Sequence, residues 1–172
     1  MLDRQCIDDH RLHNSLPRYA EPQSMAAVTH CLAVTQSAEA CAPFVSRLGQ
    51  RRILDAQADG FVEDLRQWLA AARVGSHLCI MGDEDFIWHV HRQARDAGLQ
   101  DDEIEMTLCS VSGARSIYCV HCGLTQPGDA AASLQCRGCD VLLEIREHFS
   151  RRLGAYLGVC MDADAPYARL RS

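Results

Sequence analysis

The chain has 172 residues, a formal net charge of −6 and ten cysteines, with 48% hydrophobic and 23% charged residues. The length suits one domain or one domain with a small addition, and the composition is that of a soluble globular protein. The acidic balance argues against nucleic acid or an anionic membrane as a partner. No apolar run approaches the ~20 residues that cross a bilayer, and residues 1–19 lack the apolar core of a signal peptide. We therefore expect a cytoplasmic protein.

The first part of the chain predicts an arm followed by a strand. Residues 1–24 contain Pro17, Pro22 and several charges, a pattern typical of an extended N-terminal arm. Residues 25–34 are apolar enough for a buried strand, although alanine is a weak strand former.

A short helix and a second short strand could follow. Ser37 is a suitable N-cap and Gly49 a suitable end for the helix. Pro43 would lie early in this helix or shift its start. Residues 51–56 predict either a strand or a connection.

Two amphipathic helices are predicted in the middle of the chain. The first, within residues 60–75, ends at Gly75, and its apolar face consists of Phe61, Leu65, Leu69 and Ala72. The second, within residues 83–98, begins with acidic residues that complement the helix dipole. Its apolar face consists of Phe86, Val90, Ala94 and Ala97.

Apolar strands are predicted at residues 77–82, between the two helices, and at residues 102–111, after the second helix. Helix and strand patterns therefore alternate over residues 25–112, which predicts a small α/β domain with a parallel sheet. The composition changes at Ser112–Gly113, so a second domain is expected over residues 113–172.

Four of the ten cysteines are clustered. Cys119 and Cys122 form one C-x-x-C pair, and Cys136 and Cys139 form another after a short polar insert. Each pair can direct two thiolates toward one point, and Gly123 or Gly138 could supply the positive φ of the turn. Two such pairs complete a tetrahedral sulfur site. The alternative is two unmetallated, thioredoxin-like pairs, but neither has the strand-then-helix context of that motif.

Zinc and iron both suit four thiolates. Zinc would fold a segment too small for its own core, whereas a single rubredoxin-type iron would carry one electron. The first pair, "YCVHCG", is similar to a rubredoxin knuckle, but "CRGCD" lacks the usual Pro and final Gly, which favours Zn²⁺. His121 and His148 are alternative ligands, although four thiolates already close the site. The six scattered cysteines are interpreted as buried free thiols: Cys6, Cys31, Cys41, Cys79, Cys109 and Cys160.

The stretch "REHFSRRLGAYLGVCMDADAP", together with the two cysteine pairs, resembles the C-terminal module of the DmmA-like family of dimethylamine monooxygenase subunits. The resemblance covers residues 117–166 well and the α/β part more loosely. It implies a component of an NAD(P)H- and O₂-dependent monooxygenase that removes a methyl group from dimethylamine. The implied partners are a haem-containing oxygenase and a reductase with FMN and an Fe–S centre, each a separate subunit. Those cofactors would belong to the partners.

The same tail has a pattern of its own. Phe149, Leu153, Tyr156 and Leu157 recur at helical spacing, and Arg146, Arg151 and Arg152 add positive charge to an acidic chain. One interpretation is that the apolar residues pack on the α/β domain and the arginines are solvated. The other is a partner-docking surface, because aromatic residues and arginine are frequent interface anchors. Its residues would be Arg146, Phe149, Arg151, Arg152 and Tyr156.

Residues 78–106 show a weaker likeness to the last strand–turn–helix–strand of a ferredoxin-reductase NAD-binding domain. Gly82 matches the Cys-Gly-Pro turn, but the proline is absent and Cys79 lies three residues early. Residues 32–40 contain no glycine for a pyrophosphate-binding turn. Asp83–Asp85 would repel phosphate at the helix start. We therefore expect a partly degenerate nucleotide-binding-like sheet that binds no dinucleotide, followed by a zinc-ribbon or rubredoxin-like module.

No other motif predicts catalysis. His89 and His91 are two residues apart on a helix and point in different directions. Four acidic residues are predicted to lie in a solvated turn and at a strand edge: Asp101, Asp102, Glu103 and Glu105. Three functions stay open: an accessory subunit with a structural metal, a rubredoxin-like electron-transfer subunit of the same enzyme, or a stand-alone zinc-ribbon adaptor.

Overall fold

The computed structural model describes residues 15–20, 30–47, 51–109, 115–129, 132–164 and 166. The chain divides into two compact units, one of Arg18–Ser112 and one of Met1–Pro17 with Gly113–Ser172. Most of the predicted arm, and the predicted boundary at 112–113, lie outside the described residues. The described part of the arm contains no helix or strand, and the backbone N–H of Ala20 donates to the carbonyl of Met106 (2.9 Å).

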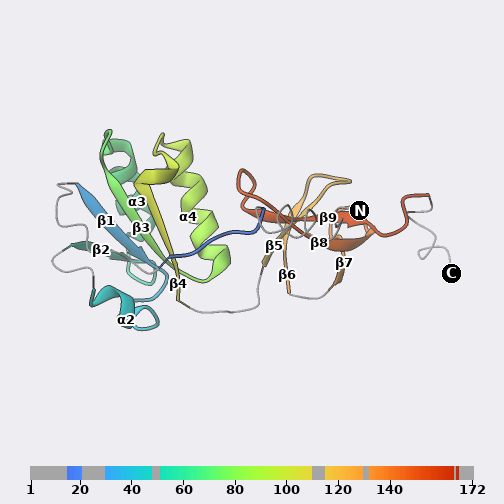
Figure 1. Cartoon of the computed structure of the whole chain (residues 1–172), viewed down its shortest axis with the longest axis horizontal. Helices are drawn as coiled ribbons and strands as arrows, with labels where there is room; N and C mark the ends of the chain where they lie inside the picture. The colour runs from blue at the N-terminus through green and yellow to red at the C-terminus, as the bar shows by residue number, and fades with distance from the viewer. Residues whose placement is uncertain are drawn as a thin grey trace, which may run out of the picture. The chain divides into compact units, whose positions relative to one another are not determined.

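The first unit is built on a four-stranded, fully parallel sheet in the order β2-β1-β3-β4 (Figure 1). Parallel neighbours need crossover connections, which is what the alternation of strands and helices in the sequence predicts. The α/β prediction is therefore confirmed. The strands are β1 (Cys31–Thr35), β2 (Arg52–Asp55), β3 (His77–Gly82) and β4 (Ile104–Leu108).

Helices lie on both faces of this sheet, with α3 and α4 on one face and α2 on the other (Figure 1). Asp83 caps α4, because its carboxylate accepts a hydrogen bond from the backbone N–H of Phe86 (2.9 Å). Gly60 precedes α3 with φ +82°, a conformation that disfavours side chains with a Cβ. The bounds are α2 (Ala42–Val45), α3 (Phe61–Ala71), α4 (Glu84–Asp96) and a 3₁₀ turn η1 (Asp101–Glu103).

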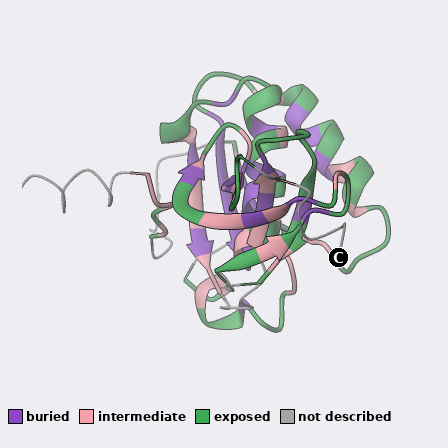
Figure 2. Ribbon diagram, turned by 90° about the vertical axis from the view of Figure 1, so that its right-hand side faces the viewer, coloured by how far each residue is buried: buried purple, intermediate pink, exposed green. Residues whose placement is uncertain are grey.

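The two faces of the sheet differ in the size of their cores. The face under α3 and α4 holds the larger cluster, centred on Leu32, Leu78 and Ile80, which are fully buried. The face under α2 holds a small cluster of Ala33, Cys41, Cys79 and Met81. Alternate residues of each strand point to opposite faces, so the two sets interleave along the chain. Figure 2 shows the resulting pattern, with buried residues on the strands and on one side of the helices.

Three local predictions in this unit are corrected. The helix expected from Ser37 begins only at Ala42, after a turn in which the Ser37 carbonyl accepts the N–H of Cys41 (3.0 Å) and the Ser37 hydroxyl accepts the N–H of Ala40 (3.4 Å). The predicted stop at Gly49 lies outside the described residues. Helix α3 ends at Ala71, and Gly75 adopts φ +84° in the loop that follows. On α4, Ala97 is exposed, whereas Ile87 is fully buried.

The second unit is a five-stranded sheet in the order β6-β5-β9-β8-β7. Strands β5 and β9 are parallel and the other pairs are antiparallel. Gly158 lies at the centre of this sheet, where an added Cβ would come within 2.9 Å of Leu143 Cδ1. The strands are β5 (Arg115–Cys119), β6 (Thr125–Gly128), β7 (Ser133–Gln135), β8 (Leu142–Ser150) and β9 (Ala155–Cys160).

The helical spacing found in the tail is wrong as a structural prediction, because those residues form the β8–β9 hairpin. Phe149 and Tyr156 are opposite each other in register, and their rings meet edge to face with centroids 5.0 Å apart. Leu153 lies in the connecting turn, which Gly154 closes with φ +61°. Apolar residues separated by a tight turn can mimic a 3.6-residue period. Only cross-strand pairing distinguishes the two arrangements.

Among the described residues, no helix is long and apolar enough to cross a membrane.

Candidate metal centre

Each C-x-x-C pair lies on a tight turn attached to a strand. Cys119 is the last residue of β5, and Cys136 follows β7 directly. Two equivalent backbone hydrogen bonds close the turns, from the N–H of Gly123 to the carbonyl of Cys119 (2.8 Å) and from the N–H of Asp140 to the carbonyl of Cys136 (2.9 Å). The two turns therefore share one design, in which each presents a pair of thiols.

The residue after each pair carries the positive φ that the turn needs. Gly123 has φ +79°, as the sequence predicts, and in the second turn Asp140 has φ +59°. Gly138 therefore serves another purpose. A Cβ at Gly138 would lie 3.0 Å from Leu124 Cδ2 and 3.4 Å from Cys122 Sγ, so the missing side chain lets the two turns approach each other.

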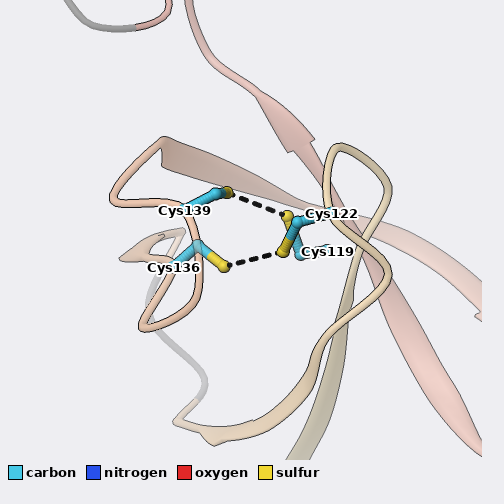
Figure 3. A group of neighbouring side chains, drawn as sticks. All are labelled: Cys119, Cys122, Cys136 and Cys139. Carbon is cyan, nitrogen blue, oxygen red and sulfur yellow. Dashed lines mark hydrogen bonds between the residues drawn. The ribbon is translucent and has the colours of Figure 1, made fainter.

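The four sulfur atoms converge on one point (Figure 3). Cys119 Sγ lies 3.8 Å from Cys139 Sγ, and Cys122 Sγ lies 3.6 Å from Cys136 Sγ. A tetrahedral site with metal–sulfur bonds of about 2.3 Å has sulfur–sulfur edges of about 3.8 Å. These two edges match a tetrahedral ion, and all four sulfur atoms lie within 4.8 Å of one another. The same edges suit zinc and a single iron, so distance alone does not choose the metal.

The site is buried on one side and open on the other. Cys119 and Cys136 are fully buried and pack with Val141 and Leu143, whereas Cys122 is exposed. Cys139 is half-buried.

Backbone amides and burial shift the pKa values of the thiols in opposite directions. Burial raises the pKa of Cys136, but the backbone N–H groups of Gly138 and Cys139 and the neighbouring thiols outweigh it and lower that pKa to about 7. Burial and the neighbouring thiols raise the pKa of Cys139 to about 12, and burial also raises the pKa of Cys119. Four crowded thiols therefore resist carrying four negative charges on their own. A divalent ion would offset that charge, and its binding would release protons.

The histidines weighed as alternative ligands lie outside this cluster. His121 and His148 are exposed, and the group of four consists of cysteines alone. The two helical histidines also stay apart, since His89 is exposed while His91 is buried with its Nε2 3.8 Å from Asp101 Oδ1.

The scattered cysteines are free thiols wherever the structure describes them, and Cys6 lies outside that part. Cys41 and Cys79 are buried in the small cluster under α2, as expected of cysteine behaving as a small apolar residue. Cys31 and Cys109 pack at the edge of that cluster. Cys160 is half-buried beside the four-cysteine site.

The hairpin separates the predicted docking residues into two groups. Phe149 and Tyr156 are each only 4% exposed. Arg151 and Arg152 are exposed in the turn, and Arg146 is exposed on β8, with its Nη2 3.0 Å from Glu144 Oε2.

One group of side chains is not predicted by the sequence patterns. Glu105 was expected at a solvated edge, but its side chain is only 13% exposed and its Oε2 lies 3.3 Å from Cys79 Sγ and 3.7 Å from His77 Nε2. The sequence contains one signal of this arrangement, the i, i+2 spacing of His77 and Cys79 on a strand. The partner strand and its register are not visible in the sequence. Asp101 and Asp102 are exposed as predicted, whereas Glu103 is half-buried and its carboxylate accepts hydrogen bonds from the backbone N–H groups of Gly75 (2.7 Å) and Gln100 (2.8 Å).

Comparison with known proteins gives two matches. Residues 116–159 match the family model "Dimethylamine monooxygenase subunit DmmA-like, C-terminal domain". The chain is also 47% identical over 161 residues to the "Heme-dependent oxidative N-demethylase delta subunit" of Ectopseudomonas mendocina (strain ymp), an alignment that covers 89% of this chain and 91% of that protein. No solved structure matches the chain.

Proposed function

The chain belongs to the DmmA-like family and is 47% identical to the delta subunit of a haem-dependent oxidative N-demethylase, and we propose that it is an accessory subunit of a multicomponent haem-dependent amine monooxygenase. The observation that carries this proposal is 47% identity across almost the full length of both chains. The complex would demethylate dimethylamine with NAD(P)H and O₂. Haem, FMN and the Fe–S centre would reside on separate oxygenase and reductase subunits.

The proposed role of the four cysteines is to hold one structural Zn²⁺. The sulfur–sulfur distances of 3.6 and 3.8 Å support a tetrahedral ion. The apolar cluster around the site is small, consisting of Cys119, Cys136, Val141 and Leu143 with two half-buried cysteines. A metal would therefore supply stability that this core does not, in the manner of a zinc ribbon.

The second candidate is a rubredoxin-like electron-transfer subunit of the same enzyme. The exposure of Cys122 favours it, because an exposed sulfur ligand would bring a redox metal close to a partner's surface. The alternative metal is then a single iron at the same four thiolates.

We propose that the α/β unit is a partly degenerate nucleotide-binding-like fold that binds no dinucleotide. The N-terminus of α4 is already occupied by the carboxylate of Asp83, which accepts from the N–H of Phe86 (2.9 Å) and from Gln36 Nε2 (3.0 Å). A phosphate there would meet a negative charge where the helix dipole should attract it.

The proposed docking surface is the turn of the β8–β9 hairpin with the adjacent arginine of β8. Arg151 and Arg152 are exposed at its tip, and Arg146 is exposed on the strand. The buried ring pair of Phe149 and Tyr156 fixes the hairpin that presents them. The complementary partner surface is an acidic patch on the oxygenase.

Membership of the complex is tested by co-purification. The tagged chain, co-expressed with the haem-containing oxygenase and reductase subunits of its own organism, is expected to elute in a complex of fixed stoichiometry that shows haem absorption. The measurement is size-exclusion chromatography with haem quantification. Elution of the chain free of the haem protein would instead support a stand-alone zinc-ribbon adaptor.

The metal is tested by elemental analysis together with a visible spectrum. Protein expressed with both iron and zinc available is expected to carry zinc in the four-cysteine site and to be colourless. Zn²⁺ has a filled d shell and no redox chemistry, so electrons would then pass between the partners and not through this chain. Iron at this site, with thiolate-to-iron charge-transfer bands, would reject the structural role in favour of the electron-transfer candidate.

A further inference from the structure

We propose that the α/β unit carries a second divalent-metal site, formed by His77, Cys79 and Glu105 and separate from the four-cysteine centre. The metal that suits this set is Zn²⁺, because one imidazole, one thiolate and one carboxylate make a mixed donor set of borderline softness. The inference rests on the geometry of the first unit alone and does not depend on the proposed role in amine oxidation.

The parallel sheet brings the three side chains together. His77 and Cys79 are two residues apart on β3, so both point to the face under α2. Glu105 pairs in register with Cys79 on the neighbouring strand β4, and directly paired residues share a face. Three ligand types therefore meet at one point, although β3 and β4 are separated in sequence by the whole of α4.

Two of the three distances between ligand atoms are close to those around a bound metal. Glu105 Oε2 lies 3.3 Å from Cys79 Sγ and 3.7 Å from His77 Nε2, and all three ligand atoms lie within 4.8 Å of one another. Bonds of about 2.0–2.3 Å to nitrogen, oxygen and sulfur give tetrahedral edges of about 3.3–3.6 Å. The two contacts of the carboxylate therefore lie close to the spacing that one shared ion would impose.

His77 supplies an independent observation. The residue is 7% exposed, and its Nε2 has no hydrogen-bond partner among the described residues. Leaving a buried polar nitrogen unsatisfied costs about 1–3 kcal/mol. The carboxylate at 3.7 Å is beyond hydrogen-bond distance, whereas a metal between the two groups would satisfy both.

Charge at the site also favours a divalent cation. The neighbouring thiol of Cys31 and burial raise the pKa of Cys79, so a metal ion would have to displace the thiol proton when it binds. The resulting thiolate and the carboxylate would carry two negative charges, which one Zn²⁺ would neutralise. Arg51 Nη1 lies 3.3 Å from Cys79 Sγ and can donate to the thiolate, as a supporting residue beyond the ligands does in many metal sites.

Two of the three side chains line a cavity, from which an exogenous ligand could reach the ion. A cavity of about 310 Å³ is lined by His77 and Glu105, and by Arg18 and Asp102 at other points of its wall. Three protein ligands with one open position are typical of zinc sites that bind water or a small exogenous ligand. The geometry thus indicates a small-ligand site and not a closed structural one.

Zinc stoichiometry of the full chain tests the proposal. Equilibrium dialysis against buffered free Zn²⁺ is expected to load two ions per wild-type chain, one in each unit. Cys79→Ala and Glu105→Gln are expected to bind one ion, with the affinity of the second site lowered at least about tenfold. Two matched controls should retain both ions: Cys109→Ala removes a thiol from the end of the same face, and Asp102→Asn removes a carboxylate from the same cavity.

Substitution of Co²⁺ for Zn²⁺ tests whether Cys79 supplies the sulfur ligand. Co²⁺ at the second site should show a thiolate-to-cobalt band that Cys79→Ala abolishes and Cys109→Ala retains. A wild-type chain that binds only one zinc ion overturns the proposal. The same number of bound zinc ions in Glu105→Gln and in Asp102→Asn also overturns it. If Cys79→Ala fails to fold, the comparison of Glu105→Gln with Asp102→Asn decides, because both changes preserve side-chain size.

Discussion

Replacing Cys122 with serine is expected to remove the metal from the C-terminal unit and to destabilise that unit by about 3 kcal/mol or more. Structural zinc contributes about 10–16 kcal/mol to the folding of small zinc-binding peptides, so one ligand of four carries several kcal/mol. Because Cys122 is exposed, serine in its place removes little buried surface. The loss would therefore report coordination and not packing.

The measurement is chemical denaturation with metal analysis, carried out on wild-type protein and on the variant, each with and without chelator. Cys160→Ser is the matched control, since Cys160 is a half-buried thiol of the same unit that lies outside the group of four. The control should keep wild-type metal content. In chelator, wild-type protein and Cys122→Ser should be equally stable. A Cys122→Ser protein with full metal content and wild-type stability would contradict the metal site.

Reversing two charges, Arg151→Glu with Arg152→Glu, is expected to leave the fold intact and to weaken binding to the haem-containing oxygenase at least about tenfold. Both arginines are exposed in the turn between β8 and β9. Like charges placed across an interface cost several kcal/mol, and the loss should shrink as salt screens the charges. Titration calorimetry or surface plasmon resonance at two ionic strengths measures both effects.

The matched control for this variant is Arg73→Glu with Arg92→Glu, which makes the same change of net charge at exposed arginines far in sequence from both the hairpin turn and the two C-x-x-C turns. The control should bind like the wild type. Equal weakening by both double variants would assign the effect to overall charge, and unchanged binding by the first would remove the hairpin turn as the docking surface.

The metal centre shows which features of a site local sequence patterns can predict. Two C-x-x-C pairs identify four ligands because each pair occupies one tight turn, whose geometry is set by neighbouring residues. The same locality explains why Gly123 was correctly assigned a positive φ. Local patterns do not predict the role of Gly138, because that role depends on Leu124 and Cys122 across the site. They also do not predict that Asp140 adopts φ +59°, a conformation in which glycine would be expected.

Local sequence patterns are enough to predict the parallel α/β pattern, the helices α3 and α4 and the membership of four cysteines in one cluster, because periodicity and close spacing record local geometry. They do not predict that the tail is a hairpin in which Phe149 faces Tyr156, which is seen only in the folded chain. Nor do they predict that Glu105 lies beside Cys79 and His77. Both depend on strand register, and register is set by packing between segments that local sequence does not relate to each other.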